Sequence, residues 1–132
     1  HATAIARAAE AMGELDLLFG KAEFGREWDC TVPRLSAEES RTLLLREARH
    51  PLLQDVLKRQ GKTVVPISLR LDRESRTLLI SGPNTGGKTV SLKTAGLLAL
   101  MTHAGFPVPA VEAEFPVFDC VLADIGDMQS IE

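Results

Sequence analysis

The chain has 132 residues, of which 45% are apolar and 25% charged, so it fits one small soluble domain or a piece of a larger one. A net charge of -3 excludes a broad basic surface for nucleic-acid backbones, and any contact with DNA or RNA is expected outside these residues. The longest strongly apolar stretch, around Ala95 to Met101, is far too short to span a bilayer and no secretory leader precedes it, which predicts a cytoplasmic protein without membrane contact.

An Ala-rich segment, residues 1–23, is predicted to form one amphipathic helix. Gly20 and Gly25 mark its expected end. Residues 28–39 contain Pro33 and show no clean period, and they are interpreted as a connector. The apolar residues of the helix recur at steps of three and four, at Ile5, Ala8, Ala9, Met12, Leu15 and Leu18/Phe19.

The middle of the chain predicts short elements separated by turns. Residues 41–46 include three successive leucines and fit either a short strand or a helical turn. Pro51 interrupts the chain before a predicted helix at residues 52–60, which Gly61 closes. Residues 63–71 and 77–81 are strand candidates, and residues 72–75 between them are predicted to form a hairpin turn.

The last third of the chain predicts a helix and a strand. Residues 90–104 are apolar on most sides, so this helix is expected to be buried, and Gly105 and Pro107 end it. Residues 115–123 are a further strand candidate. Together these elements indicate an α/β fold class. Cys30 and Cys120 match neither a disulfide framework nor a metal-ligand spacing and are predicted to be buried free thiols.

The strongest motif is a glycine-rich loop between the strand candidate at 77–81 and the helix at 90–104. It matches the phosphate-binding pattern G-x-x-x-x-G-K-[S/T], which arises by chance in roughly half a percent of chains of this length. Lys88 is expected to act as the catalytic lysine on the β- and γ-phosphates, and the Thr89 hydroxyl to ligate Mg²⁺. The residues predicted to contact ATP or ADP here are Gly82, Pro83, Asn84, Thr85, Gly86, Gly87, Lys88, Thr89 and Val90.

Three motifs together resemble the ATPase domain of the MutS family. They are Arg46-Glu47-Ala48-Arg49-His50-Pro51, the run from Leu79 through the glycine-rich loop to Thr89, and Ala123-Asp124-Ile125-Gly126-Asp127. Mismatch-repair members usually have Met where this chain has Thr85. Thr85, the run Lys88-Thr89-Val90-Ser91-Leu92-Lys93-Thr94 and the run from Asp127 to Glu132 are instead similar to the MutS-two branch.

This resemblance implies a P-loop NTPase domain of the ABC-type, MutS-like kind, present here as a partial domain with an N-terminal helix. Residues 1–24 would be the end of a lever helix, and residues 25–132 the N-terminal half of the ATPase domain, cut before its signature segment and Walker B strand. It further implies a homodimer that binds branched or recombining DNA, suppresses recombination and takes part in DNA repair. Members of this branch also act on collided ribosomes, with rRNA as a contact, and can carry a downstream endonuclease domain.

The expected activity differs between the whole protein and this chain. Phosphoryl transfer needs water positioning and charge neutralisation as well as a phosphate cradle, so we expect ATP hydrolysis by the whole protein and little or none by this chain. One alternative is an ATP-driven factor that splits collided ribosomes with the same motor. Another is a folding unit that binds no ligand. Because the complete family sheet requires further strands, an exposed sheet edge is also expected.

Five further residues have competing interpretations. Val64 and Val65 occupy the region where MutS relatives pack apolar side chains against adenine, although ordinary core packing is as good an explanation. Asp124 follows an apolar run, but no Glu follows it, which favours a structural role over a metal-binding one. His50 is interpreted as a hydrogen-bonded structural residue flanking the nucleotide site, and His103 as a helix-end or surface residue.

Overall fold

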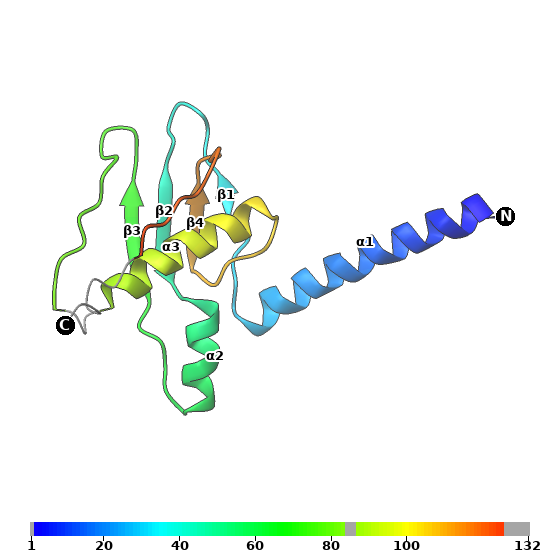
Figure 1. Ribbon diagram of the computed structural model, residues 1–132, viewed down its shortest axis with the longest axis horizontal. Coiled ribbons are helices and arrows are strands. Elements are labelled where there is room, and N and C mark those ends of the chain that lie inside the picture. Colours follow the sequence, from blue (N-terminus) through cyan, green and yellow to red (C-terminus); the bar gives the residue numbers. More distant parts are fainter. Residues whose placement is uncertain (1, 84–86, 126–132) are drawn as a thin grey trace.

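The computed structural model describes residues 2–83 and 87–125, which form three helices and one four-stranded sheet (Figure 1). The mixture of helices and strands confirms the α/β class. Figure 1 shows α3 lying across one face of the sheet and α1 projecting away from it. The elements are α1 (Ala2–Glu27), β1 (Arg34–Leu35), β2 (Leu43–Ala48), α2 (Pro51–Arg59), β3 (Ile67–Leu71), α3 (Lys88–His103) and β4 (Glu112–Phe115).

The sheet has the strand order β1-β4-β2-β3, so the last strand in sequence is one of the two in the middle. β4 pairs parallel to β1 and antiparallel to β2, and β2 pairs antiparallel to β3. The β2–β3 register shifts between Leu45 and Ala48, where Glu47 has a φ of 51°. β3 pairs on one side only among the described residues, which leaves the exposed edge that the sequence predicts.

The charged face of β4 joins three strands. Arg34 Nη2 of β1 lies 2.7 Å from Glu112 Oε1 and 3.5 Å from Glu114 Oε2, while Arg46 Nε of β2 lies 3.3 Å from Glu112 Oε2. The other face of the strand buries Ala113 and Phe115. This alternation places opposite charges on neighbouring strands, an arrangement that stabilises a sheet.

The core lies between the sheet and α3. Phe115 and Leu98 have no exposed surface and Leu45 has 1%. The buried residues of α3 are Thr94, Leu98, Ala99 and Thr102, and the two threonine hydroxyls donate hydrogen bonds within the helix, to the main-chain oxygens four residues earlier. The prediction of a helix buried on most sides is wrong, because the sheet covers one face and Leu100 on another is 55% exposed.

α1 continues past both glycines that were expected to end it. It runs to Glu27, and its last part packs on the loop that follows α3. A Cβ at Gly25 would lie only 3.1 Å from Pro107 Cγ, so glycine permits this close approach of helix and loop. The Phe24 ring meets the Phe106 ring edge to face at 6.4 Å. Gly25 therefore serves packing here and does not end the helix.

The strand predicted at residues 77–81 is not present. These residues pair with no strand in the described part of the chain, and Leu79 is 89% exposed. A cavity of about 630 Å³ separates them from β3 and has Leu69 and Ile80 in its lining. An apolar run becomes a strand only where a neighbour takes its N–H and C=O groups, and no neighbour lies within reach here. The turn at 72–75 forms, but as a turn out of β3 and not as a hairpin.

Two other strands are shorter or displaced relative to their predictions. β3 begins at Ile67 and not at Thr63, directly after Pro66, which has no N–H to donate to a ladder. The strand predicted at residues 115–123 is instead β4, which begins at Glu112 and ends before Pro116. Proline thus sets the limit of each strand. The leucine-rich segment left open between strand and helical turn is strand β2.

Candidate functional site

The described parts of the glycine-rich loop have backbone angles that favour glycine. Gly82 has a φ of 146° and Gly87 has a φ of 78°. Nothing lies within 4 Å of a Cβ built at either position, so the backbone conformation, and not crowding, is the reason for glycine here. Asn84, Thr85 and Gly86, which were predicted to contact the nucleotide, lie outside the described residues, while Pro83 is exposed.

Lys88, the first residue of α3, connects the two ends of the loop. Its ammonium donates a hydrogen bond to the main-chain oxygen of Gly82. Thr89 follows on the first turn and is exposed, and Val90 is half-buried. The N-cap of α3 is Gly87, which offers no side chain to the first-turn N–H groups. The start of this helix therefore presents main-chain donors next to a lysine, as a phosphate group requires.

His50 is within electrostatic reach of Lys93 in the first half of α3. Its Nδ1 accepts a hydrogen bond from Leu53 N at 3.5 Å and so caps α2. Burial lowers the pKa of His50, and the positive charge of Lys93 on α3 lowers it further. The structure thus brings together the His50 segment and the helix after the glycine-rich loop. Its capping bond fits the structural role predicted for His50.

Val64 lies in a cavity of about 390 Å³ next to α2, and Val65 is 84% exposed. No described residue of the glycine-rich loop lines this cavity. Two polar atoms near Val64, Arg49 Nε and Gln54 Oε1, are buried and have no hydrogen-bond partner among the described residues. The structure therefore does not join Val64 and Val65 to the loop in a single cavity.

Arg49 has a positioning role that the sequence analysis did not identify. Its Nη2 donates to the main-chain oxygens of Trp28, at 3.1 Å, and Asp29, at 2.6 Å. The backbone N–H of Arg49 also donates to Pro109 O at 2.8 Å. Arg49 is next to His50 in one of the motifs that resemble the MutS family. Its place in that motif was the sequence signal from which its role could have been predicted. Through these hydrogen bonds Arg49, which directly follows β2, links the end of α1 to the segment that contains His50.

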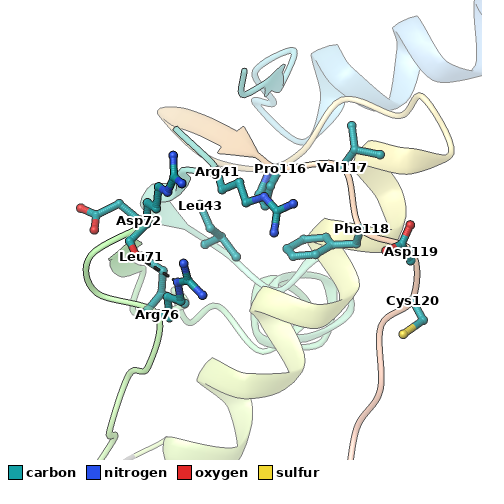
Figure 2. A pocket seen from close by; sticks show the side chains of 11 residues that line it. Arg41, Leu43, Leu71, Asp72, Arg76, Pro116, Val117, Phe118, Asp119 and Cys120 are labelled. Carbon is teal, nitrogen blue, oxygen red and sulfur yellow. Dashed lines mark hydrogen bonds between the residues drawn. The ribbon is translucent and has the colours of Figure 1, made fainter. Parts of the chain in front are cut away.

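A second cavity lies at the other end of the sheet and does not form an anion site. Figure 2 shows its side chains, in which arginines are mixed with carboxylates and a phenylalanine. Its volume is about 390 Å³, and Arg41, Arg76, Asp72, Asp119 and Phe118 are among its lining residues. Asp72 Oδ1 accepts hydrogen bonds from the backbone N–H groups of Glu74 and Ser75, which chiefly lower its pKa. With both signs of charge present, this cavity offers no clear preference for phosphate.

The Phe118 side of this cavity is fixed by His103. His103 Nδ1 lies 2.8 Å from Ala99 O, and Nε2 accepts a hydrogen bond from Phe118 N at 3.1 Å. Because a carbonyl only accepts, Nδ1 carries the proton and Nε2 is the free acceptor in this arrangement. His103 is exposed, as predicted for a surface residue, and it also anchors the segment after β4.

The remaining candidates show no cluster around them. Residues 2–83 and 87–125 contain no group of three or more His, Cys, Asp or Glu side chains that could hold a metal ion, and Asp124 is exposed. No helix in these ranges is long and apolar enough to cross a membrane. Cys30 is half-buried, and burial raises the pKa of its thiol to about 11. Cys120 is exposed, so its predicted burial is wrong, although both thiols are free as predicted.

Comparison with known proteins gives consistent matches. The family model described as MutS domain V matches residues 78–132. Endonuclease MutS2 of Pelotomaculum thermopropionicum is 47% identical over 100% of this chain and 16% of its own length. Endonuclease MutS2 of Exiguobacterium sibiricum is 49% identical over 93% of this chain and 15% of its own length, and that of Acetivibrio thermocellus is 47% identical over 92% and 14%. The chain spans about one sixth of the length of these curated relatives.

Proposed function

The chain belongs to the MutS family, in its MutS2 branch, and from this premise we propose that it forms the ATP-binding part of a DNA-processing ATPase. Its fold in the complete domain is then that of a P-loop NTPase. Residues 1–24 act as the end of a lever helix, and residues 25–132 as the N-terminal half of the ATPase domain.

The observation that carries this proposal is the contact between Lys88 and Gly82. The lysine at the start of α3 reaches back to the main chain at the opposite end of the loop, which both flanking glycines enter with positive φ. In a phosphate-binding loop the ligand lies among main-chain N–H groups and one lysine ammonium, and the described flanks supply that lysine and the glycine φ angles such a loop uses. A polyphosphate chain is the ligand class that fits such donors.

Each residue of the proposed nucleotide site has its own role in binding. The Lys88 ammonium exchanges the Gly82 oxygen for the β- and γ-phosphate oxygens, which carry more negative charge. The first-turn N–H groups of α3, at Thr89 and Val90, donate toward the same anion. The Thr89 hydroxyl would be the ligand that this chain supplies to Mg²⁺, and the ion would neutralise part of the phosphate charge. Val64 and Val65 are proposed to contact the adenine face, which requires the nucleotide to extend from the loop toward α2.

ATP hydrolysis, dimer formation and DNA binding belong to the whole protein in this proposal. The relatives carry the name of an endonuclease, and they are about six times the length of this chain. The name favours nucleic acid as the substrate, so we place the homodimer on branched DNA. Ribosome splitting by the same motor is the alternative function. Sedimentation of the full-length protein with four-way DNA junctions or with collided ribosomes, at equal salt, distinguishes the two.

The test of nucleotide binding is calorimetric titration of Mg-ADP and Mg-ATP into the chain and two variants. Lys88→Ala removes the lysine of the loop, and Lys93→Ala removes a second lysine of the same helix with the same change in net charge. We expect saturable binding in the wild type and in Lys93→Ala and its loss in Lys88→Ala, because the Lys88 ammonium bonds to Gly82 of the loop.

Binding that survives Lys88→Ala unchanged would contradict the phosphate-cradle proposal. An absence of heat in all three proteins, with no shift of the thermal midpoint, would support the folding-unit alternative. Ligand at 100 times its dissociation constant adds about 2.7 kcal/mol to the free energy of unfolding, so the thermal shift is an independent readout.

A further inference from the structure

The cavity next to α2 that contains Val64 also has Glu47 in its lining. Its volume of about 390 Å³ is in the range of small-ligand sites. Arg49 and Gln54 line it too, and Arg49 Nε and Gln54 Oε1 are buried without a hydrogen-bond partner among the described residues. Each such atom costs stability, so a wall that keeps two of them suits a polar ligand better than it suits core packing.

A β-bulge turns Glu47 toward this cavity. On β2, Arg46 and Glu47 together stand opposite the single residue Ser68 of β3, and the Glu47 N–H donates to Ser68 Oγ at 3.0 Å. Leu45 and Ala48 on either side stay buried, so the extra residue preserves the core face of the strand while Glu47 is exposed. Arg46 joins the charged face of β4, whereas Glu47 lines the cavity.

Glu47 has a backbone conformation that favours glycine. Its φ is 51°, which costs free energy in a residue with a Cβ, and the non-glycine residues that share this feature in the described part of the chain are Asp29 and Arg41. The Glu47 carboxylate has no ion pair or hydrogen bond with any described residue. Glycine would make the same bulge without strain, so a side chain here indicates a use for the carboxylate.

The chemistry of a carboxylate limits what Glu47 can bind. An ionised carboxylate only accepts hydrogen bonds, and the exocyclic amino group is the donor on the edge of adenine. Asp29, another carboxylate of the lining, lies with its Oδ2 3.7 Å from Arg49 Nη1, and the unpaired Gln54 Oε1 lies below the surface. Glu47 is therefore the accessible acceptor for an amino group in this cavity. A purine with an oxo group in that place would set its oxygen against the carboxylate.

We propose that Glu47 selects the base of the bound nucleotide by accepting a hydrogen bond from the exocyclic amino group of adenine, while Val64 contacts the ring. This inference rests on the proposed function, in which the glycine-rich loop holds the phosphates. α2 connects the two places, because His50 at its N-terminus is within electrostatic reach of Lys93 on α3 and Gln54, one turn later, lines the cavity.

The experiment compares three nucleoside diphosphates by calorimetric titration, with Mg²⁺, into this chain. ADP has the amino group, inosine diphosphate has an oxo group in its place, and 2′-deoxy-ADP lacks only a ribose hydroxyl. We expect inosine diphosphate to bind roughly tenfold more weakly than ADP, and 2′-deoxy-ADP to bind as well as ADP. Glu47→Gln should bind ADP and inosine diphosphate equally, because an amide turns to accept from an amino group or to donate to an oxo group.

The variant Glu47→Gly separates recognition from folding. Glycine relieves the positive φ, so the thermal midpoint of the ligand-free chain is expected to rise by a few degrees while the affinity for ADP falls roughly tenfold. Arg41→Gly is the matched control, since Arg41 has a φ of 42° and lines the cavity at the other end of the sheet. Its midpoint should rise as well, with an unchanged affinity for ADP. A residue that only shaped the bulge would not change stability and affinity in opposite directions.

Equal affinity for ADP and inosine diphosphate in the wild type, or a preference for ADP that survives Glu47→Gln, would overturn the role of Glu47 and leave the phosphate-cradle proposal standing. Weaker binding of 2′-deoxy-ADP alone would place the carboxylate at the ribose and also overturn selection of the base. A fall in ADP affinity in both glycine variants would show a general effect of the backbone. Absence of saturable binding by all three ligands would contradict the proposed function itself, and this inference with it.

Discussion

Arg49 binds Asp29 through both main chain and side chain: its Nη2 donates to Asp29 O at 2.6 Å, and its Nη1 lies 3.7 Å from Asp29 Oδ2. Asp29 has a φ of 50° and lies two residues after the end of α1. Arg49 follows β2 and precedes the capping residue of α2. The Arg49 guanidinium therefore helps to hold the end of α1 against the body, next to the His50 segment.

Arg49→Met is expected to lower the free energy of unfolding by about 2 kcal/mol. The substitution keeps the bulk of the side chain but removes charge-assisted hydrogen bonds to two carbonyl groups, at Trp28 and Asp29. Urea denaturation followed by circular dichroism measures the change. Arg70→Met is the matched control, since Arg70 is 67% exposed and pairs only with Asp72 at 3.6 Å, and its effect should stay below about 0.5 kcal/mol. Equal losses of unfolding free energy in both variants would show that Arg49 stabilises the protein no more than an exposed arginine does.

Phe115→Ala is expected to cost about 3–5 kcal/mol, which is enough to leave a domain of this size largely unfolded. Phe115 is fully buried where the last strand meets α3, and a cavity remains when its ring is removed. Val117→Ala, two residues later and 71% exposed, should change stability by less than about 0.5 kcal/mol. Thermal unfolding of both variants measures the difference. A folded, cooperative Phe115→Ala protein with a nearly unchanged midpoint would contradict this account of the core.

Gly87→Ala at the N-cap of α3 and Gly96→Ala in the middle of this helix are expected to change stability in opposite directions. Gly87 has a φ of 78°, which costs a residue with a Cβ about 1–2 kcal/mol. Gly96 lies inside the helix with nothing within 4 Å of an added Cβ, so alanine there adds about 1 kcal/mol through helix propensity. Denaturant midpoints test the two signs. Destabilisation by both would mean that Gly96 is confined by contacts that the described residues do not include.

His50 is expected to make stability depend on pH below neutrality. Its folded-state pKa is lowered from the ordinary value of 6.5, first by burial and then by Lys93, so the unfolded chain binds the proton more readily. The contribution of His50 to the free energy of unfolding is therefore fully present above about pH 6.5, and it is lost as the pH falls through the lowered pKa. Protonation also removes the Nδ1 lone pair that accepts Leu53 N–H.

The variant His50→Asn isolates this effect, because Asn is a good helix cap that does not titrate in this range. The difference in unfolding free energy between wild type and variant should shift in favour of the variant as the pH falls from 7 to 5. NMR titration of the His50 ring gives the pKa directly. It should rise toward 6.5 in Lys93→Met but stay below it, since burial is the larger cause. A ring pKa above 6.5 in the wild type would contradict the stated sign.

The helices were predictable from sequence, and their ends were less so. The period of the Ala-rich start and the apolar run after the glycine-rich loop each predicted a helix where one occurs. The end of α1 was missed because Gly25 is read locally as a terminator, whereas its packing against Pro107 is a contact over 82 positions. Periodicity contains no information about such a contact.

The strands depended on partners that the sequence does not name. Residues 77–81 have strand composition but no neighbour, whereas β4 has two charged residues among four and lies in the middle of the sheet. The alternation of charged and apolar residues in Glu112-Ala113-Glu114-Phe115 is typical of a strand with one buried face. Its two charges made a strand in the middle of the sheet hard to predict. Arg34 lies 80 positions from its partner Glu114 and Arg46 lies 66 positions from its partner Glu112, so only the fold reveals these pairs.

The glycine-rich loop was predicted from its motif alone, because such a motif depends on local backbone geometry. Gly82 and Gly87, which flank the loop, have the positive φ angles that are typical of a phosphate-binding loop. Contact with a nucleotide stays a prediction. Val64 and Val65 were inferred from resemblance, and their relation to the loop depends on the long-range arrangement of α2 and α3. That arrangement is what sequence patterns least determine.

The central place of β4 determines when this sheet can form during synthesis. β1 reaches β2 only through β4, and the parallel pairing joins Arg34 to Glu114 across 80 positions. Until residue 115 has been made, a growing chain can close the β2–β3 pair and form its helices, yet β1 has no strand to join and Phe115 is missing from the core. Late closure of a long-range pair is slow and leaves apolar surface open to other chains. A nascent chain stopped just before Glu112 thus exposes apolar surface of β2 and α3 that the finished sheet covers.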